Sequence, residues 1–174
     1  MKKILMSMVA LFAAVTMNAQ NEMYVGGTLN FQTKANVANK SVITVAPEIG
    51  MSLNEQFGVG AVLSYTASQD VYNAFTINPY LRYNLVKLDK VNLFVDGGFD
   101  FTNTKYHSYK NNTWGIGVKP GVAVNLNENI SFVAHMGFLG YRSSKDDTDG
   151  AKATNTVGLN LDGTDLSFGF YYNF

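Results

Sequence analysis

Apolar and polar residues alternate one by one along most of this chain. The alternation runs through eight stretches, at residues 24–31, 41–53, 57–65, 75–85, 91–101, 114–126, 130–141 and 166–174. A period of two is typical of β-strands with one apolar face, whereas helices repeat every three or four residues. The stretches are roughly 9–13 residues long, which exceeds the usual five or six residues of strands in soluble sheets. They match the ~9–11 residues that a tilted strand needs to cross a membrane.

The segments between these stretches alternate in length. Residues 54–56, 86–90 and 127–130 are short turns, whereas TKANVANK, ASQDVYN, NTKYHSYKNN and RSSKDDTDGAKAT are longer and polar. Short turns at one rim and longer loops at the other are the pattern of outer-membrane barrels. The sequence therefore predicts an all-β fold, an eight-stranded antiparallel up-and-down transmembrane β-barrel.

The chemical character of the two strand faces supports a barrel with lipid on its outside. One face carries large apolar side chains, and the other carries Gly, Ser, Asn and charged residues. The structural alternatives, a soluble sandwich or a lipocalin-like, ligand-binding barrel of the periplasm, would keep the outer face polar. Charged residues make up 15% and aromatic residues 13% of the chain, against roughly 25% charged residues in average soluble domains.

The first 19 residues have the three-part pattern of an export signal. Lys2 and Lys3 precede an apolar run from Ile4 to Val15, and Ala19 is a small residue before the expected cut. The run is shorter than the ~20 apolar residues of a spanning helix. We therefore expect residues 1–19 to be a cleaved signal peptide and residues 20–174 to be one outer-membrane barrel domain.

Cysteine and charge exclude further classes of function. The chain has no Cys, which excludes disulfides, thiolate catalysis and a lipid anchor on a Cys after the cut. Once Lys2 and Lys3 leave with the signal, 11 of the 13 basic residues remain against 13 acidic ones, a formal charge of −2. Nucleic-acid binding, which needs a strongly basic face, is not indicated.

The closing stretch, LSFGFYYNF, carries large side chains to the last residue. Its outer stripe is Phe168, Phe170, Tyr172 and Phe174. A closed barrel leaves no unpaired edge in lipid, so this stretch is expected to be the last strand and to pair with the first. The stripe resembles the C-terminal signature of bacterial outer-membrane barrels, whose terminal aromatic is read by the barrel-assembly machinery.

The whole predicted mature chain resembles the small eight-stranded OmpA/OmpX-like barrels, a class also filed as outer-membrane β-barrel or porin-family proteins. The resemblance rests on the signal pattern, the eight alternating stretches and the terminal aromatic stripe taken together. It implies a monomer in the outer membrane of a Gram-negative bacterium, in contact with outer-membrane lipid.

The polar strand faces place charged groups in the lumen of such a barrel. They are Glu48, Arg82, Asp96, Asp100, Lys119 and His135. A barrel of eight strands is just wide enough for side chains to fill it, and buried charges have to be paired. We therefore expect a packed polar core in which the carboxylates pair with Arg82 and Lys119. A proton path or narrow ion pore is the alternative.

Aromatic residues near the strand ends are expected to form girdles at the two membrane surfaces. At the short-turn rim they are Tyr24, Phe57, Tyr83, Tyr172 and Phe174, and at the opposite rim Tyr65, Phe101 and Trp114. Their role is to anchor the barrel, and we assign them no binding function.

No residue pattern indicates catalysis, a metal or a cofactor. A nucleophile needs its base within hydrogen-bond reach, and the neighbours His107 and Ser108 face opposite ways on a strand. The acidic run KDDTDG at 145–150 lacks the spacing of an EF-hand calcium loop, and its three Asp supply few of the six to eight oxygens that Ca²⁺ takes. A lipid-modifying enzyme is therefore a less favoured alternative.

The longer loops are the candidate contact sites for a surface partner, at residues 35–40, 67–73, 104–112 and 142–154. Residues 155–163 either extend the last strand above the membrane or form a loop. As a strand they would offer an edge to which a partner strand could add. The expected function is non-enzymatic, in membrane integrity or surface adhesion, with a narrow porin-like channel as the alternative.

Overall fold

The computed structural model describes residues 22–34, 40–68, 71–148, 150–160 and 166–174. The regular elements in these ranges are all strands: β1 (Met23–Lys34), β2 (Lys40–Ser52), β3 (Phe57–Ser68), β4 (Tyr72–Lys87), β5 (Val91–Tyr106), β6 (Lys110–Asn125), β7 (Ile130–His135), β8 (Phe138–Asp146), β9 (Thr154–Asn160) and β10 (Ser167–Asn173). Among these residues no helix is long and apolar enough to cross a membrane. The predicted signal peptide, residues 1–19, lies outside the described ranges.

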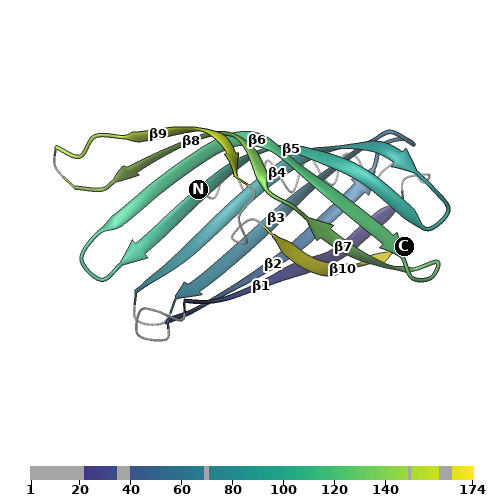
Figure 1. Ribbon diagram of the computed structural model, residues 1–174, viewed down its shortest axis with the longest axis horizontal. Coiled ribbons are helices and arrows are strands. Elements are labelled where there is room, and N and C mark those ends of the chain that lie inside the picture. The colour runs from purple at the N-terminus through teal and green to yellow at the C-terminus, as the bar shows by residue number, and fades with distance from the viewer. Residues whose placement is uncertain (1–21, 35–39, 69–70, 149, 161–165) are drawn as a thin grey trace.

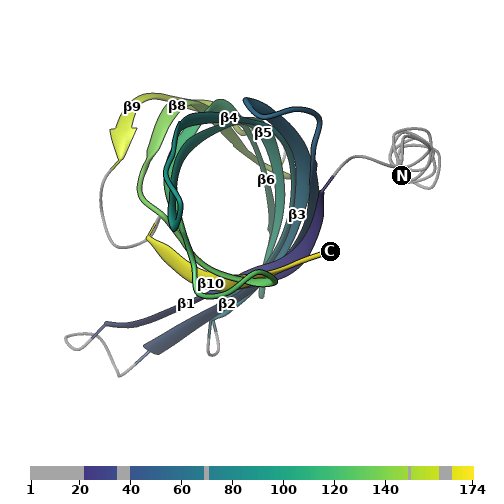
Figure 2. The ribbon, with the colours of Figure 1, turned by 90° about the vertical axis from the view of Figure 1, so that its right-hand side faces the viewer.

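The strands close into an antiparallel barrel (Figures 1 and 2). β1 to β6 pair in chain order, and β10 pairs with β1 on one side and β7 on the other. Two positions in the wall are each filled by two short strands. β7 and β8 both pair with β6 and share one position. β10 pairs with β7 and β9 pairs with β8, so these two strands share the next position. The ten strands therefore make eight wall positions, and the predicted fold class is confirmed.

The break between β7 and β8 reverses which residues face the lumen. Gly137 has a φ of 68°, a left-handed conformation that glycine adopts without steric cost. His135 lies inside before the break, and Phe138 lies inside after it, at 4% exposure. A regular strand would put these two residues on opposite faces. The alternation in this stretch is less clean than in the others, and the expectation that it puts Phe138 on the outer face is wrong.

Asparagine side chains organise two of the short turns. Asn54 Oδ1 accepts the backbone N–H groups two and three residues further on, at 2.9 and 2.8 Å, and Asn127 Oδ1 does so at the same two distances. Such bonds reverse the chain tightly. The carboxyl terminus lies at this end of the barrel (Figure 1), where the Phe174 N–H donates to the Met23 carbonyl at 2.9 Å.

The connections at the opposite end are shorter than expected. β5 ends at Tyr106 and β6 begins at Lys110, so most of the predicted 104–112 loop is strand. The predicted loops at 67–73 and 142–154 are likewise shortened by β3, β4 and β8, while residues 35–39 lie outside the described ranges. These strand ends carry polar residues on both faces, such as Asn103 and Asn112, which share a hydrogen bond of 2.7 Å between their side chains. Strand ends without an apolar face show no alternation, so alternation fails to predict them.

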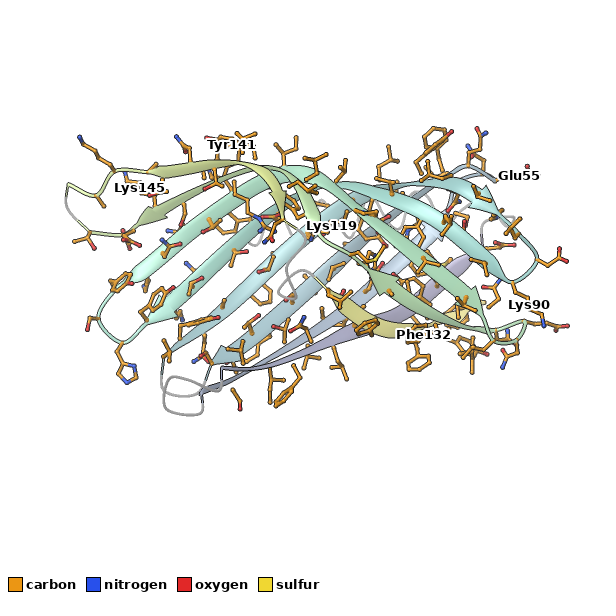
Figure 3. The ribbon with its side chains drawn as sticks, in the orientation of Figure 1. Glu55, Lys90, Lys119, Phe132, Tyr141 and Lys145 are labelled. Atoms are coloured by element: carbon orange, nitrogen blue, oxygen red, sulfur yellow. The ribbon has the colours of Figure 1, made fainter. Side chains whose placement is uncertain are left out.

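The outer wall is apolar and the lumen is polar. Leu29 is 63% exposed, Ile116 59% and Phe170 56%, whereas Glu48 is 3% and Arg82 6% exposed. Soluble domains have the reverse distribution. Figure 3 shows Phe132 among many side chains that project from the wall. The prediction of a lipid-facing outer surface is confirmed.

Candidate functional site

An ionic cluster crosses the middle of the lumen, with Arg82 of β4 at its centre. Arg82 Nε donates to Asp96 Oδ1 at 2.7 Å and Nη2 donates to Asp96 Oδ2 at 2.8 Å, a bidentate pair between residues that are register partners on β4 and β5. Arg82 Nη2 also lies 3.3 Å from Glu48 Oε1 of β2. The opposite charges are thus paired inside the wall, which buried charges require.

Two tyrosines complete the partners of Glu48, and a third bonds to one of them. The Tyr80 hydroxyl donates to Glu48 Oε1, the Tyr171 hydroxyl donates to the same oxygen at 2.7 Å, and the Tyr24 and Tyr80 hydroxyls are 2.6 Å apart. The Tyr24 ring stacks on Tyr171 with ring centres 4.7 Å apart. Tyr24 is 8% exposed, so its expected place in an outer girdle is wrong.

Apolar side chains fill the rest of this cross-section. The Phe94 ring lies 3.8 Å from the Arg82 guanidinium carbon and is 1% exposed, beside fully buried Val133. His135 Nε2 lies 3.0 Å from Asp96 Oδ2, with its ring edge-on to Phe94. We call this set the central layer: Tyr24, Glu48, Tyr80, Arg82, Phe94, Asp96, Val133, His135 and Tyr171.

The central layer separates two cavities. The upper cavity, towards the longer connections, has a volume of about 390 Å³ and is lined below by Glu48, Tyr80, Asp96 and His135. The lower cavity, towards the short turns, has a volume of about 660 Å³ and is lined by Tyr24, Arg82 and Tyr171. The residues that line the two cavities on their facing sides all belong to the central layer, so a single layer of side chains divides the lumen.

Asp100 and Lys119 do not join the central layer, contrary to the predicted pairing. Asp100 is 6% exposed and lines the upper cavity, and so does half-buried Lys119. Among the described residues no ion pair reaches either of them. Lys119 is the register partner of Asp96, but Asp96 is already occupied by Arg82 and His135.

Arg142 is a lumen residue that the sequence analysis missed, because it was assigned to the 142–154 loop. It lies on β8, lines the upper cavity and stacks its guanidinium carbon 3.9 Å from the Phe138 ring. The signal that could have found it is the glycine at 137. If the alternation restarts after Gly137, Phe138, Gly140 and Arg142 fall on one face.

The aromatic stripe at the end of the chain faces outward, as β10 pairs on both sides. Phe168, Phe170, Tyr172 and Phe174 are 47%, 56%, 47% and 74% exposed. Of the eight residues assigned to girdles, all except Tyr24 are 37–74% exposed on the outer wall: Phe57, Tyr65, Tyr83, Phe101, Trp114, Tyr172 and Phe174. Their exposure agrees with contact to lipid and its interfaces, while recognition by the assembly machinery stays a prediction.

The residues considered for catalysis and metal binding lie apart. His107 and Ser108 are exposed in the turn between β5 and β6, and His135 belongs to the central layer. In the described ranges no three His, Cys, Asp or Glu side chains are grouped to hold a metal ion. In the 145–150 segment, Asp146 Oδ1 accepts a hydrogen bond from Asn111 Nδ2 at 2.6 Å.

Comparisons with known proteins agree with this geometry. The model of a family described as "Outer membrane protein beta-barrel domain" matches residues 4–174. Among solved structures, the chain is similar to the N-terminal β-barrel domain of Pseudomonas aeruginosa OprF, with 10% identity, a TM-score of 0.55 and coverage of 88% of this chain and 97% of that one. OprG from Pseudomonas aeruginosa has 15% identity and a TM-score of 0.53, with 88% and 95% covered.

Neisserial surface protein A, NspA, has 13% identity and a TM-score of 0.52, with 88% of this chain and 96% of that chain covered. At these identities the likeness shows the fold. No curated protein matches the sequence.

Proposed function

The chain belongs to the outer-membrane protein β-barrel domain family, and from this premise we propose that it is a non-enzymatic barrel of the outer membrane that acts by surface interaction. One observation carries the proposal: at the upper end of the wall, residues 154–159 of β9 and 31–34 of β1 have a neighbouring strand on one side only among the described residues, beside a lumen that is filled at mid-height. The chemistry of such edges favours binding of another chain over transport.

The unpaired edges belong to β9 and β1. In the described ranges residues 154–159 of β9 pair only with β8, and β1 pairs with β10 as far as Leu29. Asn30 Nδ2 donates to the Leu166 carbonyl at 2.5 Å, and beyond it residues 31–34 of β1 pair, among the described residues, with β2 alone. Figure 2 shows β9 and the projecting ends of β1 and β2 on either side of this part of the wall.

An unpaired edge offers backbone N–H and C=O groups to an incoming strand. β9 is seven residues long, and its outward side chains Val157 and Leu159 are 78% and 60% exposed. An incoming strand would gain ladder hydrogen bonds and cover these side chains. The proposed surface role also fits the name of NspA, which is a surface protein.

Neither histidine of the chain forms a nucleophile–base dyad among the described residues, which supports the non-enzymatic part of the proposal. A nucleophile needs a base in hydrogen-bond reach, and His135 is engaged by Asp96 at 3.0 Å. His107 lies in an exposed turn.

The test uses proline on β9, because consecutive N–H groups of an antiparallel edge strand point alternately to the neighbour and to the free side. Of Thr156→Pro and Val157→Pro, one removes a bond to β8 and the other removes only a free-edge donor. Lys152→Pro, in the connection before β9, is the matched control. The readout is adherence of a non-adherent Gram-negative host displaying each variant to epithelial cells and matrix-coated plates.

We expect the barrel to confer adherence, and the free-edge proline to abolish it without loss of the folded barrel on a heat-modifiability gel. Adherence retained by both β9 variants would contradict strand addition. If the barrel confers no adherence on the host, and native cells that lack the barrel become sensitive to detergent, the role that remains is membrane integrity.

A narrow channel is the second candidate, favoured by the single layer of side chains between the two cavities. Rearrangement of Arg82 between carboxylates would open a polar path through it. Planar-bilayer recordings decide this point: a channel requires discrete current steps from the wild-type protein and larger steps from Arg82→Ala. Silent wild-type and variant barrels would exclude conduction.

A further inference from the structure

The upper cavity is lined by two charges of opposite sign, Asp100 and Lys119, that have no ion-pair partner among the described residues. The cavity volume of about 390 Å³ lies within the range of small-molecule sites. Its wall is rich in hydroxyl groups from Thr and Ser, and it faces the long-connection end of the barrel. Hydroxyl groups both donate and accept hydrogen bonds, which suits a polar ligand.

Asp100 is the first of these charges. Its side chain is buried, at 6% exposure, and it lines the cavity. Within the described part of the chain its carboxylate forms no hydrogen bond or ion pair. It lies beside Gly115, where an added Cβ would be 2.8 Å from Asp100 Oδ2 and 3.0 Å from Arg142 Cγ. A buried carboxylate without a partner is costly, so a ligand that supplies one gains from the pairing.

Lys119 is the second charge. Its Nζ lies 5.9 Å from the centre of the Phe138 ring. The guanidinium carbon of Arg142 lies 3.9 Å from the centre of the same ring. Phe138 thus holds Lys119 by a cation–π contact and leaves its three N–H donors directed at no carboxylate in the described ranges.

The register sets the spacing of the two charges. Asp100 is the register partner of Gly115 on β6, and Lys119 lies four residues further along the same strand. Four residues span about 14 Å of strand, a gap that the long Lys side chain shortens but does not close. A ligand that meets both groups must therefore carry its own charges several bonds apart.

We propose that the upper cavity is a binding site for a small zwitterion with separated charges, whose ammonium group binds Asp100 and whose anionic group binds Lys119. A simple cation would pair Asp100 but leave Lys119 unpaired, and would be repelled by Lys119 and Arg142. A simple anion would leave Asp100 unpaired. Only a ligand with both charges compensates both residues.

The first test compares three probes with the same number of carbons by isothermal titration calorimetry on the refolded barrel in detergent: 4-aminobutanoate, butylammonium and butanoate. We expect 4-aminobutanoate to bind at least about tenfold more tightly than either singly charged probe. Glycine, whose charges are one carbon apart, is expected to bind more weakly than 4-aminobutanoate. The proposal is overturned if the zwitterion does not bind or if a singly charged probe binds equally well. Equal affinity for glycine would overturn the separated-charge requirement.

The second test removes each charge in turn. Asp100→Asn and Lys119→Gln keep side-chain size, and each is expected to weaken 4-aminobutanoate binding at least about tenfold. Asp89→Asn, in the turn between β4 and β5 at the opposite end, is the matched control and should bind like wild type. The two test residues lie on different strands, so a folding failure of one variant leaves the other to decide. Unchanged affinity in a folded variant overturns the proposal.

Discussion

Asp96 and Asp100 lie four residues apart on the same strand, face the same lumen and are equally buried at 6% exposure. Asp96 accepts two bonds from Arg82 and contacts His135, whereas Asp100 has no ion-pair partner in the described ranges. Burial and charge alone therefore do not define the role of a lumen carboxylate. The level at which the residue sits does: Asp96 belongs to the central layer that holds the barrel together, and Asp100 belongs to a cavity that is open to a ligand.

The largest expected effect comes from removing the hub of the central layer. Arg82→Ala leaves Glu48 and Asp96 buried without their cation, and breaking such a pair costs about 3–5 kcal/mol. The free energy of unfolding is measured in urea with lipid vesicles, followed by the fluorescence of Trp114, the only Trp in the chain. Arg82→Lys keeps the charge but loses the bidentate geometry. Its free energy of unfolding should lie between those of wild type and Arg82→Ala. A wild-type value for Arg82→Ala would contradict the structural role of this layer.

The two aspartates themselves give the sharpest contrast. Asp96→Asn loses charge-assisted bonds worth about 1.5–3 kcal/mol, so its free energy of unfolding should drop by that order. Asp100→Asn removes an unpaired buried charge, so its stability should equal or exceed that of wild type. The same urea titration compares both. Equal losses in the two variants would mean that the two levels of the lumen are not distinct.

Glycines facing the lumen make room for the tyrosines of the central layer. A Cβ at Gly60 would lie 2.2 Å from Tyr80 Oη, whereas a Cβ at Gly158 would meet nothing within 4 Å. Gly60→Ala displaces the hydroxyl that donates to Glu48 and should cost about 1–3 kcal/mol, as overpacking does. Gly158→Ala is the control and should leave the thermal midpoint unchanged. If both variants have the same thermal midpoint, the space around the Tyr80 ring is not tight.

The smallest effect on stability is expected at the outer wall. Phe174 is 74% exposed, and Phe174→Ala should change the free energy of unfolding by no more than about 0.5 kcal/mol. Its backbone bond to Met23 does not need the ring. The same variant should assemble poorly in cells, as judged by the amount of heat-modifiable barrel in outer-membrane fractions. Normal assembly would remove the role predicted for the terminal aromatic stripe.

Alternation in the sequence was sufficient to predict the barrel, because lipid on one side and a packed lumen on the other impose a period of two on every membrane strand. It identified the inward positions of Glu48, Arg82, Asp96 and His135. It failed at Gly137, where a left-handed residue shifts the phase and brings Phe138 and Arg142 inside. It also failed at the long-connection end, where β5, β6 and β8 extend beyond the predicted stretches.

Partner choice in the lumen was predicted less well than position. Alternation assigns a face, but it gives no distance along the barrel axis. Lys119 is opposite Asp96 in register, yet the fork of Arg82 reaches both carboxylate oxygens of Asp96 and excludes it. Tyr24 was assigned to a girdle because it lies near a strand end, although its parity placed it inside. The pairing of the first and last strands was expected, but alternation gives no register, so the stacking of Tyr24 on Tyr171 was not predicted.

The central claim, that one layer of side chains divides the lumen into two compartments, is tested most directly by thiol labelling. The chain has no natural Cys, so Ser64→Cys in the upper cavity and Ser52→Cys in the lower cavity each provide a single reactive site. A small, charged methanethiosulfonate reagent is added outside proteoliposomes in which the barrel's upper end faces outward. We predict rapid labelling of Ser64→Cys and none of Ser52→Cys until the vesicles are permeabilised. Equal labelling of both sites in sealed vesicles would contradict the account.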